Sequence, residues 1–179
     1  MNERDALGDR LAELRRTFDG AFAEPPRAIA IEQEDLLRIG VGGDAYAVRL
    51  REVAGLFVDR AIVPLPSRSP ELFGLAGLKG GIVPVYDLGA LLGYPASPEP
   101  PRWLLMARHE MDVGFGIEEF RSYLRVPLSS FSQVSEGTAR TAHVLELVRA
   151  GDSLVPVLSL RSLAESIAER AGAIDTHKG

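Results

Sequence analysis

Two stretches of this sequence follow one pattern. Residues 82–88 read Ile-Val-Pro-Val-Tyr-Asp-Leu, residues 154–160 read Leu-Val-Pro-Val-Leu-Ser-Leu, and a further leucine follows each at the same offset, as Leu91 and Leu163. Short apolar runs rich in β-branched residues are typical of strands, and the leucines that follow fit the first turns of a helix. A strand-to-helix unit that occurs twice predicts two β subdomains of similar build, each closed by a short helix.

Individual residues of this unit predict its local geometry. Pro84 and Pro156 have no N–H to donate to a ladder, so each is expected on an edge strand or at a β-bulge. Asp87 and Ser159 stand just before the predicted helices, where their side-chain oxygens can accept hydrogen bonds from the first helical N–H groups. Gly93 is expected to end the first helix, because glycine readily adopts the left-handed conformation required there.

Other matched segments extend the repeat over most of the chain. Apolar residues alternate on both sides of Gly42-Gly43-Asp44, which predicts a hairpin, and a second hairpin is predicted over residues 104–117 with its turn near 110–112. The glycines at 42 and 43 are not a nucleotide-binding loop, because such a loop needs a helix after it and residues 45–50 alternate as a strand. A proline-rich run at 94–101 resists both helix and sheet and breaks the sequence near its middle.

An amphipathic helix is predicted before the β-rich part of the chain. Apolar residues recur there at intervals of three and four, and Pro25-Pro26 ends the helix because proline cannot continue the hydrogen-bond ladder. The apolar face can pack on its own domain or dock a partner, and both readings stay open. This possible docking face consists of Leu7, Leu11, Leu14, Phe18 and Phe22.

Composition excludes several classes of function. The chain has 25 acidic and 20 basic residues and a net charge of −5, so we expect no nucleic acid as a partner. No apolar run reaches the length of about 18 residues that a membrane span needs, and the charged start MNERDALGDR does not resemble a signal peptide, so a cytoplasmic location without membrane insertion is expected. With no cysteine and three histidines, neither a metal nor another cofactor is predicted.

No catalytic residue is predicted, although one alternative remains. The serines at 129, 130 and 132 lack the Gly-x-Ser-x-Gly elbow of many hydrolases, and His143 is expected to point outward from a strand. His109 and Asp112 fall near the turn of the second hairpin and have no second histidine at metal-ligand spacing. The alternative is a small hydrolase or ligand-binding double barrel that uses His109, Asp112 and the loop Ser129–Ser132.

Three segments resemble the CheW family, the coupling proteins of bacterial chemotaxis. They are Tyr46-Ala47-Val48, the run Ile-Val-Pro-Leu-Pro at 62–66 and the stretch Gly74–Leu88, which is similar to the family pattern Gly-x-x-Asn-Leu-Arg-Gly-x-x-x-Pro-Val-x-Asp-Leu. The resemblance covers about residues 35–170. We therefore assign 31–172 to a CheW-like domain, 1–30 to a helical extension with a proline-containing linker, and 173–179 to a flexible tail.

The resemblance implies both a fold and a role. The fold is two small five-stranded, SH3-like β-barrels with short helices, whose spatial halves need not be the sequence halves if strands are exchanged. The role is that of a scaffold without catalysis, which bridges the regulatory domain of a chemotaxis-type histidine kinase and the cytoplasmic tips of chemoreceptors in membrane-associated arrays. A variant of this hypothesis keeps the scaffold fold and gives it a different partner, bound through the N-terminal helix.

The resemblance also implies a set of partner-contacting residues. Lys79 stands where the family has the arginine of Asn-Leu-Arg-Gly, which keeps the charge and loses the planar bidentate fork. Gly77 replaces the asparagine of that motif, and Gly55 stands where many relatives have an acid. The predicted partner-binding residues are Lys79, Gly77, Val53, Gly55, Gly74 and Leu78.

Overall fold

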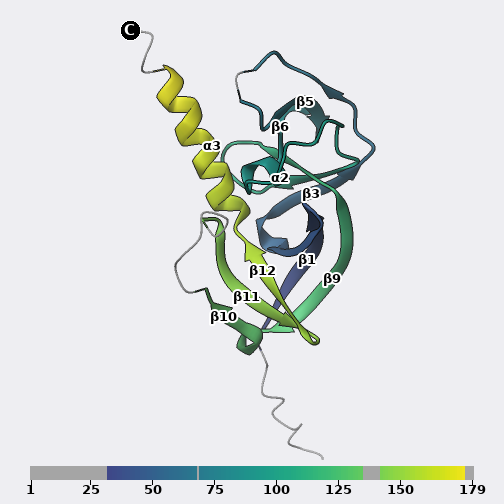
Figure 1. Ribbon diagram of the computed structural model, residues 1–179, viewed down its shortest axis with the longest axis vertical. Coiled ribbons are helices and arrows are strands. Elements are labelled where there is room, and N and C mark those ends of the chain that lie inside the picture. Colours follow the sequence, from purple (N-terminus) through teal and green to yellow (C-terminus); the bar gives the residue numbers. More distant parts are fainter. Residues whose placement is uncertain (1–31, 68, 135–141, 176–179) are drawn as a thin grey trace, which may run out of the picture. The chain divides into compact units, whose positions relative to one another are not determined.

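The structure is a computed structural model that describes residues 32–67, 69–134 and 142–175 (Figure 1). The chain divides into two units, Met1–Glu32 and Gln33–Gly179, and the fold is that of the second unit. The predicted N-terminal helix, with its face from Leu7 to Phe22, and the last four residues of the predicted tail lie outside the described residues.

Two six-stranded sheets make up the described fold, which confirms the mainly β prediction. One sheet has the order β10 (Phe131–Gln133), β11 (Val144–Ala150), β12 (Ser153–Leu158), β2 (Asp44–Arg49), β1 (Gln33–Val41) and β9 (Glu119–Pro127). The other has the order β3 (Val53–Val58), β7 (Trp103–Ala107), β8 (Gly114–Ile117), β6 (Gly81–Asp87), β5 (Leu72–Leu78) and β4 (Ile62–Val63). The sixth strand of each sheet is a short end strand of two or three residues, β4 or β10.

Short helices connect or close these sheets. Two 3-10 turns, η1 (Leu50–Glu52) and η2 (Leu128–Ser130), follow β2 and β9, and the helices α2 (Leu88–Leu91) and α3 (Leu160–Asp175) follow β6 and β12. The two matched strand-to-helix units are therefore β6–α2 and β12–α3, in which the second helix is four times as long as the first.

The two halves of the sequence exchange their first hairpins. The β1–β2 hairpin pairs with β12 through parallel contacts such as Val157 with Ala47, whereas the β7–β8 hairpin pairs with β6 through contacts such as Val85 with Gly114. Each sheet thus combines the first hairpin of one half with the second hairpin of the other. The two sheets have the same strand order, with β4, β5 and β6 in the places of β10, β11 and β12 and with β8, β7 and β3 in the places of β2, β1 and β9. The proline-rich run at 94–101 is consequently not a boundary between the sheets.

Pro84 and Pro156 do not lie on edge strands, so the edge alternative is wrong, whereas a register shift of the β-bulge kind lies close to each proline, opposite Val85–Tyr86 and Val157–Leu158. Both lie in interior strands, β6 and β12. The parallel ladder on one side of each strand begins at the next residue, Val85 or Val157. At the proline itself the strand is paired on its antiparallel side only, so a residue without an N–H is tolerated.

The predicted caps and turns are confirmed. The Ala90 N–H donates to Asp87 Oδ1 at 3.2 Å, and the Ser162 N–H donates to Ser159 Oγ at 3.2 Å. Gly93 follows α2 with a φ of +86°, in the left-handed region that favours glycine. Both predicted hairpins are present, as β1–β2 and β7–β8.

The main core lies between the two sheets and beneath α3. Ile39 of one sheet, Leu105 and Phe115 of the other and Leu163 of α3 are fully buried members of one cluster. A smaller apolar cluster lies within each sheet, one around Leu36 and one around Val83. Since the largest cluster draws on both sheets, neither sheet has a complete core without the other.

Candidate functional site

Lys79 lies at the tip of the β5–β6 hairpin. It has a φ of +49° and is followed by Gly80 with +82°, which is the pair of positive values that a tight hairpin turn requires. Its side chain is exposed, and Nζ donates a hydrogen bond to the carbonyl oxygen of Ala54 in β3. The hairpin tip and β3 therefore meet through this cation, although they lie in strands that are not neighbours in the sheet.

Gly55 lies beside Lys79, in the position where the family pattern has an acid. A Cβ atom on Gly55 would stand 3.4 Å from Lys79 Cε but 2.8 Å from the ring of Phe57. The Phe57 ring in turn lies 5.6 Å from the guanidinium carbon of Arg60. In this chain an aromatic ring thus occupies space that a side chain at 55 would need, and Lys79 bonds to a backbone carbonyl.

The other predicted site residues fall into two groups. Val53 and Leu78 are 6% and 1% exposed, so their side chains belong to the core. Gly74 is buried with a φ of +144°, and a Cβ there would lie 2.1 Å from the carbonyl oxygen of Val63. Gly77 is exposed with open space around it. A role in partner binding remains a prediction for the whole set.

Strands β4, β5 and β6, which include the hairpin that carries Lys79, have an apolar outer face. Directly paired residues point to the same side of a sheet, and the register pairs Val63 with Leu75, Leu75 with Pro84, and Gly77 with Ile82. Ile82 is 77% exposed and Val63 is 63% exposed, large values for apolar side chains on a strand. We call these five residues the first outer face: Val63, Leu75, Gly77, Ile82 and Pro84.

An equivalent surface lies on the other sheet. There the register pairs Ser132 with Leu147, Leu147 with Pro156, and Arg149 with Leu154. Leu154 occupies the place of Ile82 and is 53% exposed. We call these five residues the second outer face: Ser132, Leu147, Arg149, Leu154 and Pro156. Neither face was predicted from the sequence, although each proline is flanked by the valines that proved to be buried and lies two residues after the exposed Ile82 or Leu154.

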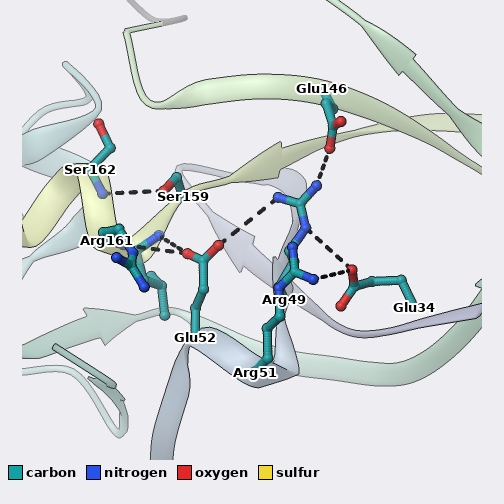
Figure 2. A network of polar contacts seen from close by, with 9 residues as sticks. Glu34, Arg49, Arg51, Glu52, Glu146, Ser159, Arg161 and Ser162 are labelled. Carbon is teal, nitrogen blue, oxygen red and sulfur yellow. Dashed lines mark hydrogen bonds and ion pairs between the residues drawn. The ribbon is translucent and has the colours of Figure 1, made fainter. Parts of the chain in front are cut away.

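A polar network joins the sheet that contains β1, β2 and β11, and the η1 turn after β2, to the start of α3 (Figure 2). The guanidinium of Arg49 forms ion pairs with Glu34, Glu52 and Glu146, the first two at 3.7 Å and 4.0 Å. Glu52 Oε2 also accepts hydrogen bonds from the N–H groups of Leu160 at 2.7 Å and Arg161 at 3.3 Å. Because Glu52 lies in the turn between β2 and β3, it caps α3 from the connection between the two sheets. The Arg-Leu-Arg-Glu string at 49–52 was the only sequence signal for this network.

The structure does not group His109 with the serine loop as the hydrolase alternative requires. His109 lies in the β7–β8 loop, where Nδ1 accepts a hydrogen bond from the Met111 N–H at 3.3 Å. Ser132 belongs to the other sheet, where it is paired with Leu147. Among the described residues, no three His, Asp or Glu side chains are grouped as metal ligands, and no helix is long and apolar enough to cross a membrane.

His143 differs from its prediction. It lies in the turn before β11 rather than on a strand, and its Nδ1 is hydrogen-bonded to Ser162 Oγ of α3 at 3.0 Å. Burial lowers the pKa of His143, and the positive charge of Arg170 lowers it further. The sequence could not show this, because the contact depends on where α3 packs.

The lowered pKa of His143 predicts a pH-dependent stability. An unfolded histidine has a pKa of about 6.5, so below that pH the unfolded chain binds a proton more readily than the folded one. The neutral His143 side chain therefore contributes to the free energy of unfolding in full above pH 6.5, and this contribution is lost as the pH falls through the lower pKa of the folded state. We expect the melting temperature to fall between pH 7.5 and 5.5 and to fall less in His143→Gln. Equal slopes for the variant and for wild type would contradict this, and His109→Gln is the control.

Comparison with known proteins gives a consistent set of relatives. The family model described as "CheW-like domain" matches residues 35–168. Two curated relatives are each named "Chemotaxis protein CheW". The one from Bacillus subtilis is 20% identical over 79% of this chain and 94% of its own length, and the one from Thermotoga maritima is 21% identical over 81% and 97%. The crystal structure of the scaffolding protein TtCheW from Thermoanaerobacter tengcongensis has a TM-score of 0.66 and 17% identity, and covers 74% of this chain and 92% of that chain.

Proposed function

The chain belongs to the family of CheW-like domains, and from that membership we propose that it is a non-catalytic adaptor that couples chemoreceptors to a chemotaxis-type histidine kinase. The match spans most of the chain and nearly the whole length of two relatives named as chemotaxis proteins. A solved protein of the same fold carries the word "scaffolding" in its name. The proposed place of action is the cytoplasmic side of receptor arrays.

The observation that carries this proposal is the pair of equivalent outer faces. An adaptor must bind two partners at once, so it needs two surfaces that do not overlap. The first outer face lies on β4–β5–β6, and the second lies on β10–β11–β12 of the other sheet. Each exposes a large aliphatic residue at equivalent positions, Ile82 or Leu154. Exposed apolar residues with polar residues at the rim are typical of protein–protein interfaces.

We assign the kinase regulatory domain to the first outer face. This face has a cation at its rim, because Lys79 follows Gly77 and Leu78 at the hairpin tip. Ile82 would be the apolar anchor and Lys79 would fix the orientation of the partner by charge. Val53, Leu78 and Gly74 would hold the hairpin in place from within the core. The second outer face is then free for a receptor.

Calorimetric titration of the whole chain with a kinase regulatory domain tests this assignment. Ile82→Glu is expected to weaken binding by tenfold or more, because an apolar anchor contributes about 2 kcal/mol or more and a buried charge opposes docking. Lys79→Glu is expected to weaken it by a smaller factor, since a rim charge acts chiefly on orientation and association. Both residues are exposed, so the melting temperature should change little.

Leu154→Glu is the matched control, since it changes the equivalent residue of the second outer face. It should leave the kinase affinity within twofold of wild type and weaken binding of a receptor tip. Wild-type kinase affinity in Ile82→Glu would contradict the assignment of the kinase to the first outer face. Unchanged affinity in Lys79→Glu alone would remove Lys79 from the site and leave Ile82 in it.

A further inference from the structure

Three arginines from different elements surround a depression at the start of α3. This depression has a volume of about 410 Å³ and is lined by Arg51 of η1, Glu52, Arg108 of the β7–β8 loop and Arg161 of α3. A second depression, of about 590 Å³, shares Arg108 and Arg161 and extends over His109, Glu110 and Glu165. We call Arg51, Arg108 and Arg161 the arginine cluster. None of the three belongs to either outer face.

The arginines keep most of their hydrogen-bonding capacity. A guanidinium has five N–H donors. Arg51 Nη1 is 3.0 Å from Glu34 Oε2, and Arg108 Nη2 donates to the Val53 carbonyl at 3.3 Å. The side chain of Arg161 has neither a hydrogen bond nor an ion pair among the residues that the structure describes. Most of the donors that line the depression are therefore available to a ligand.

The single carboxylate in the smaller depression is already engaged. Glu52 Oε2 accepts the first N–H groups of α3, and Glu52 Oε1 is 4.0 Å from Arg49 (Figure 2). Three guanidinium groups consequently face this depression with one occupied carboxylate among them. A local excess of positive charge stands out in a chain with a net charge of −5.

We propose that the arginine cluster binds a glutamate- or aspartate-rich segment of a partner protein. Guanidinium groups bind carboxylates through two parallel hydrogen bonds, and arginines from three elements can bind more than one carboxylate. The proposed site is the smaller depression, where three guanidinium groups outnumber one carboxylate, and Glu110 and Glu165 of the larger depression limit how far an acidic segment can extend on that side.

The probe is an acetylated and amidated hexaglutamate peptide that carries a fluorophore. It is titrated with the full chain at low salt, with anisotropy as the readout and hexalysine as the negative control. The double variant Arg108→Gln/Arg161→Gln is expected to raise the dissociation constant at least tenfold. Arg102→Gln, which changes an exposed arginine paired with Asp59, should change it less than twofold. Raising the salt to about 0.3 M should weaken the wild-type complex, since exposed charges are then screened.

Arg161→Gln alone guards against a folding defect, because that side chain has no ion pair among the described residues and its loss should leave the melting curve unchanged. Equal binding by wild type and by the folded variants would overturn the proposal. So would failure of the folded wild-type chain to bind the peptide at low salt. Tighter binding of inorganic phosphate than of hexaglutamate, lost in the same variants, would overturn the assignment to an acidic protein segment. Kinase affinity is measured separately, so failure here leaves the adaptor proposal standing.

Discussion

Gly74→Ala is expected to lower the free energy of unfolding by about 3 kcal/mol or more, because backbone strain and overpacking act at the same atom. Gly74 has a φ of +144°, and an added Cβ would meet the Val63 carbonyl oxygen at 2.1 Å and its carbonyl carbon at 2.7 Å. Both are backbone atoms of β4, so the clash can be relieved only by displacing that strand from β5. Urea denaturation of the variant measures the loss directly.

Gly77→Ala is the matched control for this prediction. Gly77 lies in the same strand, has no positive φ, and has open space where its Cβ would be placed. Its replacement should leave the unfolding free energy within about 0.5 kcal/mol of wild type or raise it slightly, because alanine loses less chain entropy on folding. Similar losses for the two variants would show that β5 tolerates no side chain for some reason other than the close approach of Val63.

Arg49→Ala is expected to lower the unfolding free energy by about 3–5 kcal/mol, the range found when one partner of a buried ion pair is removed. Its side chain is mostly buried and lies between the carboxylates of Glu34, Glu52 and Glu146, which are themselves largely buried. Without the guanidinium these three acids would repel one another with little water to screen them. Thermal and urea unfolding of the variant give the magnitude.

Arg102→Ala provides the comparison, because Arg102 forms an ion pair with Asp59 in which both side chains are well exposed. Such pairs contribute at most about 1 kcal/mol. The loss of unfolding free energy in Arg49→Lys should lie between the losses in Arg49→Ala and Arg102→Ala. Lysine keeps the positive charge but lacks the guanidinium fork that reaches several carboxylates. If Arg49→Ala and Arg102→Ala lowered the unfolding free energy equally, the network around Arg49 would contribute no more to stability than an exposed ion pair.

Features decided within a few residues could be predicted from the sequence. The Gly42-Gly43 turn, the caps at Asp87 and Ser159 and the end of α2 at Gly93 each depend on the conformational or hydrogen-bonding preference of one residue type. These preferences do not change when the rest of the chain folds, so the local elements followed from the sequence alone.

Features decided by distant contacts could not be predicted. Pro84 was expected on an edge strand or at a β-bulge because proline cannot donate to a ladder. The sequence does not show that the parallel pairing of β6 with β8 begins only at the next residue, Val85. The contacts of Glu52 with Leu160 and of Arg49 with Glu146 span 108 and 97 residues. Which charges meet over such separations depends on topology, and a single sequence does not supply it.

The candidate site lies between these two cases. The resemblance singled out Lys79 and Gly77, and both are exposed, Lys79 in the turn of the β5–β6 hairpin and Gly77 near the end of β5. It could not show that Phe57 occupies the space beside Gly55, or that Val53 and Leu78 face the core. Exposure and packing on a strand depend on which side its neighbours cover, and this depends on the exchanged hairpins.

The exchange of hairpins has a consequence for how the protein folds. β6 obtains its second neighbour only when β8 has been added, and β12 obtains its second neighbour only from β2, far back in the chain. Contacts of such high sequence separation slow folding, because much chain entropy is lost before they form. We therefore expect one slow, concerted transition rather than independent folding of two halves. In a partly folded chain both outer faces would lie on sheets that lack the hairpin from the other half, so the proposed coupling of a kinase to a receptor would need a completely folded molecule.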